Sequence, residues 1–111
     1  MIYIGFSTKT NRLYVRILCR HFRHVAPIIV TKHGCIIYQF VSKKQISLIT
    51  IKHKDLKILE LFGWKFIKYD GKFIPQQSKK PVNCVQWTKQ ACGIKNIFIQ
   101  TPDSLFKYLN K

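Results

Sequence analysis

The sequence predicts an α+β fold, in which a small antiparallel sheet packs against helices in one domain covering residues 1–111. Two apolar segments, 24–30 and 35–41, flank a polar turn, which is typical of an antiparallel hairpin. Two further segments, after Asn83 and after Thr101, begin with residues that cap helices. With 111 residues, 47% of them hydrophobic, the chain can bury one modest core but not two.

The first half of the chain predicts strands on either side of one helix. Residues 2–7 predict a short strand, and residues 12–22 predict a helix with its apolar positions turned inward. The hairpin follows, and Pro27 inside its first strand indicates an edge or a bulge there. Residues 46–51 predict a further strand.

The second half predicts a helix from about Asp55 to residue 62, which ends at Gly63. Residues 64–69 and 72–74 predict a second hairpin, and a polar loop then leads to Asn83. Residues 97–99 predict a short strand or an extended connector. In the last helix Thr101 is the cap, proline takes the first position, and the inward face is expected to contain Leu105, Tyr108 and Leu109.

The most informative stretch places Cys84 on the first turn of a short amphipathic helix. Asn83 suits the N-cap, and Gly93 suits the position after the last turn. The expected buried face consists of Val85, Thr88, Ala91 and Cys92. Unpaired amides and the helix dipole favour a thiolate at Cys84, so this residue is a candidate nucleophile.

A nucleophilic thiolate needs a base, and the chain has four histidines. His24 opens a buried strand, which would hold its imidazole rigidly, and His21 is the alternative. His33 and His53 are expected at the surface. The thiols of Cys19, Cys35 and Cys92 are expected to be structural, since unreactive cysteines are often buried in cores.

Three motifs carry a resemblance to a known family, and together they span residues 4–109. They are Ile4-Gly5-Phe6-Ser7 leading to Phe22-Arg23-His24-Val25, the helix Asn83-Cys84-Val85 with its Gly93-Ile94 ending, and the helix start Thr101-Pro102-Asp103-Ser104-Leu105. Their order resembles the circularly permuted NlpC-like branch of the papain superfamily, which includes lecithin-retinol-acyltransferase-like proteins. The resemblance implies a permuted papain-like arrangement of the α+β fold.

The same resemblance implies a cysteine hydrolase or acyltransferase that acts on amide, peptide or ester bonds. Cys84 would be the nucleophile and His24 the base, and backbone amides at the Asn83 helix start would stabilise the oxyanion. The third residue, which orients the imidazole, would be Gln39 or Tyr38. Peptides of peptidoglycan are a plausible substrate, and no cofactor is implied.

The charge is the second strong feature: 20 basic residues against 4 acidic residues give 20 − 4 = +16. Such a field favours polyanions, which include nucleic acid, anionic cell-wall polymer, anionic lipid and acidic protein partners. One helix face carries Arg12, Arg16, Arg20 and Arg23. This stripe predicts phosphate or carboxylate binding, although a solvated helix face would have the same pattern.

The alternative function is therefore a noncatalytic basic module that binds nucleic acid or a structural partner in a virion. Small basic proteins of this kind also occur in bacteriophages, which suggests a role in host-wall processing or in the virion. The four carboxylates argue against carboxylate-based catalysis, and the His and Cys spacings do not match common zinc sites. With no signal segment and no apolar run of about 18 residues, cytoplasmic synthesis is expected.

Overall fold

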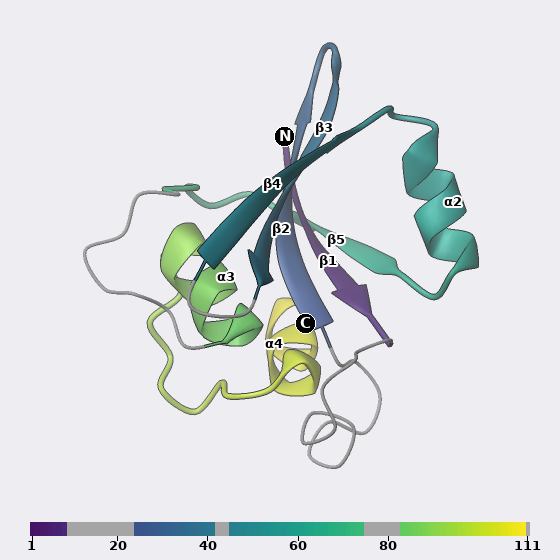
Figure 1. Ribbon diagram of the computed structural model, residues 1–111. Helices are drawn as coiled ribbons and strands as arrows, with labels where there is room; N and C mark the ends of the chain where they lie inside the picture. Colours follow the sequence, from purple (N-terminus) through teal and green to yellow (C-terminus); the bar gives the residue numbers. More distant parts are fainter. Residues whose placement is uncertain (9–23, 42–44, 75–82, 111) are drawn as a thin grey trace.

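The computed structural model describes residues 1–8, 24–41, 45–74 and 83–110. It has the predicted α+β class, with a five-stranded antiparallel sheet in the order β4-β3-β2-β1-β5 (Figure 1). The strands are β1 (Ile2–Ser7), β2 (His24–Thr31), β3 (Gly34–Val41), β4 (Gln45–Ile51) and β5 (Lys65–Tyr69). The described helices are α2 (Asp55–Leu61), α3 (Cys84–Cys92) and α4 (Pro102–Leu109). The helix predicted over residues 12–22 lies outside the described residues.

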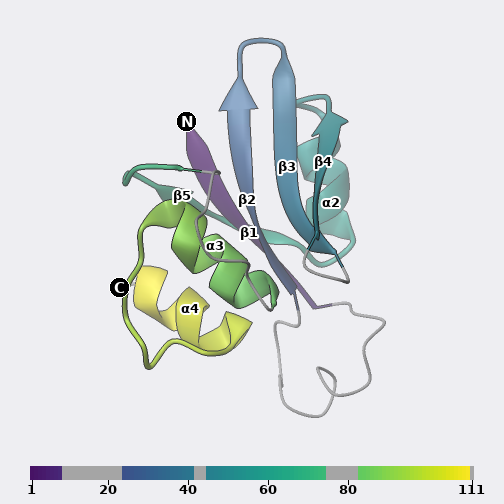
Figure 2. The same ribbon diagram turned by 60° about the vertical axis from the view of Figure 1, so that its left-hand side comes forward.

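Side chains alternate between the two faces of the sheet along each strand, and helices cover both faces. Helices α3 and α4 lie on one face, where Ile4, Phe6 and Val25 form the centre of the core. Helix α2 lies on the other face, against Ala26 and Ile28. Figure 2 shows α3 and α4 in front of the sheet and α2 behind it. We refer to these as the α3 face and the α2 face.

The predicted first hairpin is confirmed, and its register explains Pro27. The pairing of β2 with β3 runs from Thr31↔Gly34 to Ile28↔Ile37 and stops there. Pro27 is the next residue of β2, and its missing N–H cannot donate to a neighbouring strand. The hairpin therefore pairs tightly at its turn end, and from Pro27 back to His24 strand β2 pairs with β1 and not with β3.

The two capped helices begin as predicted. The Asn83 side chain accepts a hydrogen bond from the Gln86 N–H at 2.8 Å, and Gly93 closes α3 with φ 71°. Thr101 and Ser104 form a capping box around Pro102 at the start of α4. Because these bonds satisfy an otherwise free amide in each first turn, both helices have fixed starting points on the sheet.

Helix α3 is fastened to the sheet by its buried face. Every residue predicted for that face is buried: Val85, Thr88, Ala91 and Cys92. Trp87 is also buried, and its indole Nε1 donates to the Tyr38 carbonyl on β3 at 2.9 Å. This bond joins α3 to a strand that is far away in the sequence, so it fixes the position of Cys84 above the sheet.

The predicted second hairpin is wrong in its second strand. β5 pairs with β1 in the register Ile4↔Ile67, because the N-terminal strand offers a free edge. Residues 72–74 form no strand and turn toward α3 instead. There the Ile74 N–H donates to the Ala91 carbonyl at 2.7 Å, and Phe73 packs against Tyr38 with ring centroids 4.9 Å apart.

The structure differs from two smaller predictions, one in α4 and one at residues 97–99. Tyr108 of α4 was expected to face inward but is 40% exposed, and Phe106 packs edge-on against Phe6 instead, with centroids 5.2 Å apart. Residues 97–98 form a turn and residue 99 has no regular structure, so of the two forms predicted for 97–99 the strand is excluded. In both places packing of an aromatic ring or a short local turn outweighed the sequence pattern.

Candidate functional sites

Cys84 occupies the position that the sequence predicted, the first residue of α3. Its side chain is half-buried and packs beside the cluster formed by Phe40, Trp87 and Ala91. Its carbonyl accepts a hydrogen bond from the Thr88 hydroxyl at 2.9 Å. The thiol is not part of a disulfide. Cys84 therefore lies on the α3 face of the sheet.

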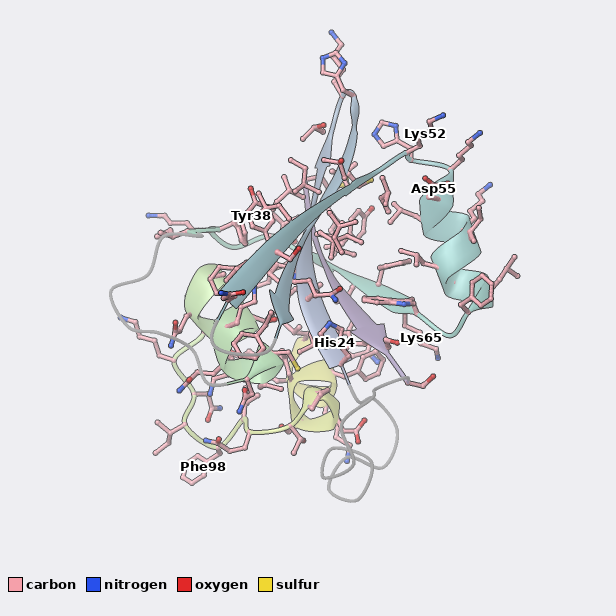
Figure 3. All side chains as sticks on the ribbon, in the orientation of Figure 1. His24, Tyr38, Lys52, Asp55, Lys65 and Phe98 are labelled. Atoms are coloured by element: carbon pink, nitrogen blue, oxygen red, sulfur yellow. The ribbon has the colours of Figure 1, made fainter. Side chains whose placement is uncertain are left out.

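His24 is the first residue of β2 and belongs to the α2 face. Every second side chain of a strand points to the same face, so His24 shares the face on which Ala26 and Ile28 pack. Its imidazole meets the Trp64 ring edge-on, with centroids 6.0 Å apart. Trp64 in turn packs on Gly5 at the position where any other residue would have its Cβ atom, which would be 3.0 Å from the indole ring. Figure 3 shows His24 at the start of β2.

The predicted catalytic residues are therefore divided between the two faces of the sheet. Gln39 is two residues from Ile37 on β3, so it shares the α2 face with His24. Tyr38 lies on the α3 face with Cys84. The sheet separates the imidazole of His24 from the thiol of Cys84. The alternative base His21 and the stripe of Arg12, Arg16, Arg20 and Arg23 lie outside the described residues.

The other described cysteines have the properties of structural thiols. Burial raises the pKa of the Cys92 thiol to about 12. Burial also raises the pKa of the Cys35 thiol, and the negative charge of Asp55 adds to the increase. Because the thiolate is the reactive form, neither residue should react readily near neutral pH. Cys19 lies outside the described residues.

This geometry predicts the alkylation pattern of the native protein. We expect Cys84 to be modified by iodoacetamide well before Cys35 and Cys92, because it is half-buried at a helix start while they are buried. We expect the His24→Ala substitution to leave the Cys84 rate unchanged, since the two side chains lie on opposite faces. Mass spectrometry of each cysteine over a range of pH measures these rates.

The matched variant in this experiment is His21→Ala. A Cys84 rate that falls at neutral pH in His24→Ala protein would contradict the separation described above. A rate that falls only in His21→Ala protein would identify His21 as the partner of the thiol. Equal rates in all three proteins would indicate that neither histidine activates Cys84.

The described residues offer neither a metal site nor a membrane-spanning helix. They contain no group of three or more His, Cys, Asp and Glu side chains that could hold a metal ion. None of the described helices has the length and apolar character needed to cross a membrane.

A cluster of lysines that the sequence did not predict lies at the turn end of the β2–β3 hairpin. Its members come from two segments: Lys32 and His33 from the turn, and Lys52, His53, Lys54 and Lys57 from the stretch that leads into α2 and its first turn. All of these side chains are exposed. We call this set the hairpin-end cluster.

The register of the sheet brings the two segments of this cluster together. Cys35 pairs with Ile51, so the next step of the same register puts Lys52 beside Gly34, at the base of the turn. A hydrogen bond then links the segments directly, because the His53 Nε2 lies 2.6 Å from the Thr31 carbonyl oxygen, which accepts. The cluster therefore has a fixed framework on the sheet.

The carboxylate nearest this framework is already used for folding. Asp55 accepts a hydrogen bond from the Lys52 N–H at 3.0 Å and starts α2, as the sequence predicted (Figure 3). Glu60 is the other acidic residue of α2. The lysine ammonium groups thus outnumber the local carboxylates and give this end of the molecule a positive potential.

Part of this cluster could be predicted from the sequence. The Thr31-Lys32-His33-Gly34 turn was predicted, and His33 and His53 were correctly expected at the surface. Their proximity depends on the pairing of β3 with β4, which no local pattern specifies.

Comparisons with models of protein families, with curated proteins and with solved structures found no match.

Proposed function

We propose that this protein is a noncatalytic basic module that binds nucleic acid through the phosphate backbone. The observation that carries the proposal is the hairpin-end cluster, in which Lys32, Lys52, Lys54 and Lys57 come from two separate segments and gather on one rigid framework. Lysine binds phosphate as a compact point charge, so a group of lysines suits a chain of phosphates. The net charge of +16 attracts the polyanion from a distance.

The contacts in this proposal are to phosphates, so binding is largely independent of base sequence. Exposed lysines on a turn and at a helix start can follow a flexible or a duplex backbone. His33 and His53 add further hydrogen-bonding groups to the same surface. The affinity would come mainly from the release of counterions and should depend steeply on salt.

Fluorescence anisotropy with labelled single-stranded and double-stranded oligonucleotides tests the proposal. We expect binding at low salt, with the logarithm of the association constant falling linearly as the logarithm of the salt concentration rises. Oligonucleotides of different base sequence should bind alike. Failure to bind either form at low salt would overturn the proposal and would favour an acidic protein, such as a virion component, as the partner.

The second candidate is the thiol hydrolase with a permuted papain-like arrangement. The position of Cys84 at the capped start of α3 favours it, because this is the location that the mechanism requires. The location of His24 on the opposite face counts against the predicted pair, so this candidate needs His21 as the base. Hydrolysis of peptidoglycan peptides or model esters by the native protein, lost in Cys84→Ala protein of intact fold, would establish it.

A further inference from the structure

Strand β4 is an edge of the sheet with an unusual composition. Among the described strands it is the last on its side, because the order ends β3-β4. Its sequence, Gln-Ile-Ser-Leu-Ile-Thr-Ile, contains no charge, no proline and no glycine. Leu48 is 58% exposed and Ile49 is 39% exposed. Natural edge strands are usually protected by charge, by proline or by a bulge, and β4 has none of these.

The opposite edge of the sheet shows the usual protection. β5 carries Lys65 and Lys68, and both side chains are exposed (Figure 3 labels Lys65). A charged edge resists pairing with another strand. In a chain where 20 of 111 residues are basic, seven consecutive uncharged residues on an exposed edge are therefore informative.

The register shows which backbone groups of β4 point away from the sheet. Thr31 and Gly34 close a two-residue turn, so they form a hydrogen-bonded pair, and Gly34 directs its backbone groups toward β2. Orientation alternates along β3, so Cys35 directs its groups toward β4 and its partner Ile51. Along β4 the backbone groups of the odd-numbered residues therefore bond to β3. The backbone N–H and C=O groups of Ile46, Leu48 and Thr50 point away from the sheet.

These three residues are arranged symmetrically about Leu48. If a second β4 approaches antiparallel, Leu48 lies opposite Leu48 of the other copy, and Ile46 lies opposite Thr50. Each outward N–H then meets an outward carbonyl, and within residues 45–51 no charged side chain faces another. We propose that β4 pairs with β4 of a second copy of this chain, through a two-fold axis at Leu48, to form one continuous sheet.

The side chains at this axis support the pairing. Ile46, Leu48 and Thr50 lie on the α3 face, because Phe40 pairs with Ile46 and both belong to one cluster there. Ile46 is already half-buried in that cluster, whereas Leu48 has most of its surface exposed. Pairing would bring the two Leu48 side chains together and remove apolar surface from water.

The net charge gives this dimer a distinctive response to salt. Two copies that each carry +16 repel one another, and added salt screens the repulsion. The dimer should therefore become tighter as salt is raised, whereas a complex with an acidic partner or with nucleic acid should become weaker. The proposal does not depend on the nucleic-acid binding proposed above.

Sedimentation velocity of the full chain over a range of protein and salt concentrations tests the inference. We expect a monomer–dimer equilibrium that shifts toward dimer as salt rises. The test variants are Leu48→Lys, which puts a charge at the axis, and Thr50→Pro, which removes an outward N–H without touching the bonds to β3. Each should weaken dimerisation by roughly tenfold or more, because each change occurs twice in a dimer.

Asn110→Lys is the matched control, since it adds the same charge at an exposed site after α4 and should dimerise like the native chain. Circular dichroism checks that each variant is folded, and having two test variants guards against the failure of either one. A native chain that stays monomeric at high salt would overturn the inference. So would a dimer that persists unchanged in both test variants.

Discussion

The Trp87→Ala substitution is expected to lower the free energy of unfolding by about 3–5 kcal/mol, the largest stability effect that we predict. Trp87 is 2% exposed and packs in a cluster with Phe40 and Ala91. Its removal leaves a cavity and also deprives the Tyr38 carbonyl of a donor at 2.9 Å. Because domains are stable by only about 5–15 kcal/mol, the alanine variant should be largely unfolded at modest denaturant concentrations.

Trp87→Phe separates the two contributions. Phenylalanine keeps most of the apolar volume but cannot donate to the Tyr38 carbonyl, so we expect a smaller loss of about 1–2 kcal/mol. Urea unfolding curves for the native chain and both variants measure the difference. A loss below about 1 kcal/mol for Trp87→Ala would contradict the buried position of this residue and its role in fastening α3 to the sheet.

Local signals in the sequence predicted most of the elements, because each element carries its own chemistry. The caps at Asn83 and Thr101 and the glycine at Gly93 specify helix ends without any tertiary contact. The alternation in the first hairpin likewise specifies two strands. The partner of β5 was missed, since pairing with β1 joins segments about sixty residues apart and no local pattern encodes that choice.

The candidate site shows the same limit more sharply. The sequence placed Cys84 correctly at a helix start and His24 correctly on a strand. It could not say which face of the sheet each residue occupies, and a shift of one residue along β2 would exchange the faces. The hairpin-end cluster was missed for a related reason, because Lys32 and Lys52 become neighbours only through the register of β3 and β4.

Neutralising the hairpin-end cluster is expected to have the largest effect on binding. In the triple variant Lys52→Ala, Lys54→Ala and Lys57→Ala we expect oligonucleotide affinity to fall roughly 100-fold at about 0.1 M salt. The slope of log affinity against log salt should decrease by up to about three, because each lost phosphate contact lowers it by about one. All three side chains are exposed, so the fold should be unaffected.

The matched control removes the same charge elsewhere: Lys72→Ala, Lys95→Ala and Lys107→Ala, all at exposed positions. Both triple variants reduce the net charge equally, so a long-range field alone would weaken binding equally in both. A local contact surface predicts a large loss and a smaller salt slope only in the hairpin-end variant. Equal losses would contradict the assignment of the cluster as the binding site, because they would show that the ligand responds to total charge and not to the arrangement that the β3–β4 register creates.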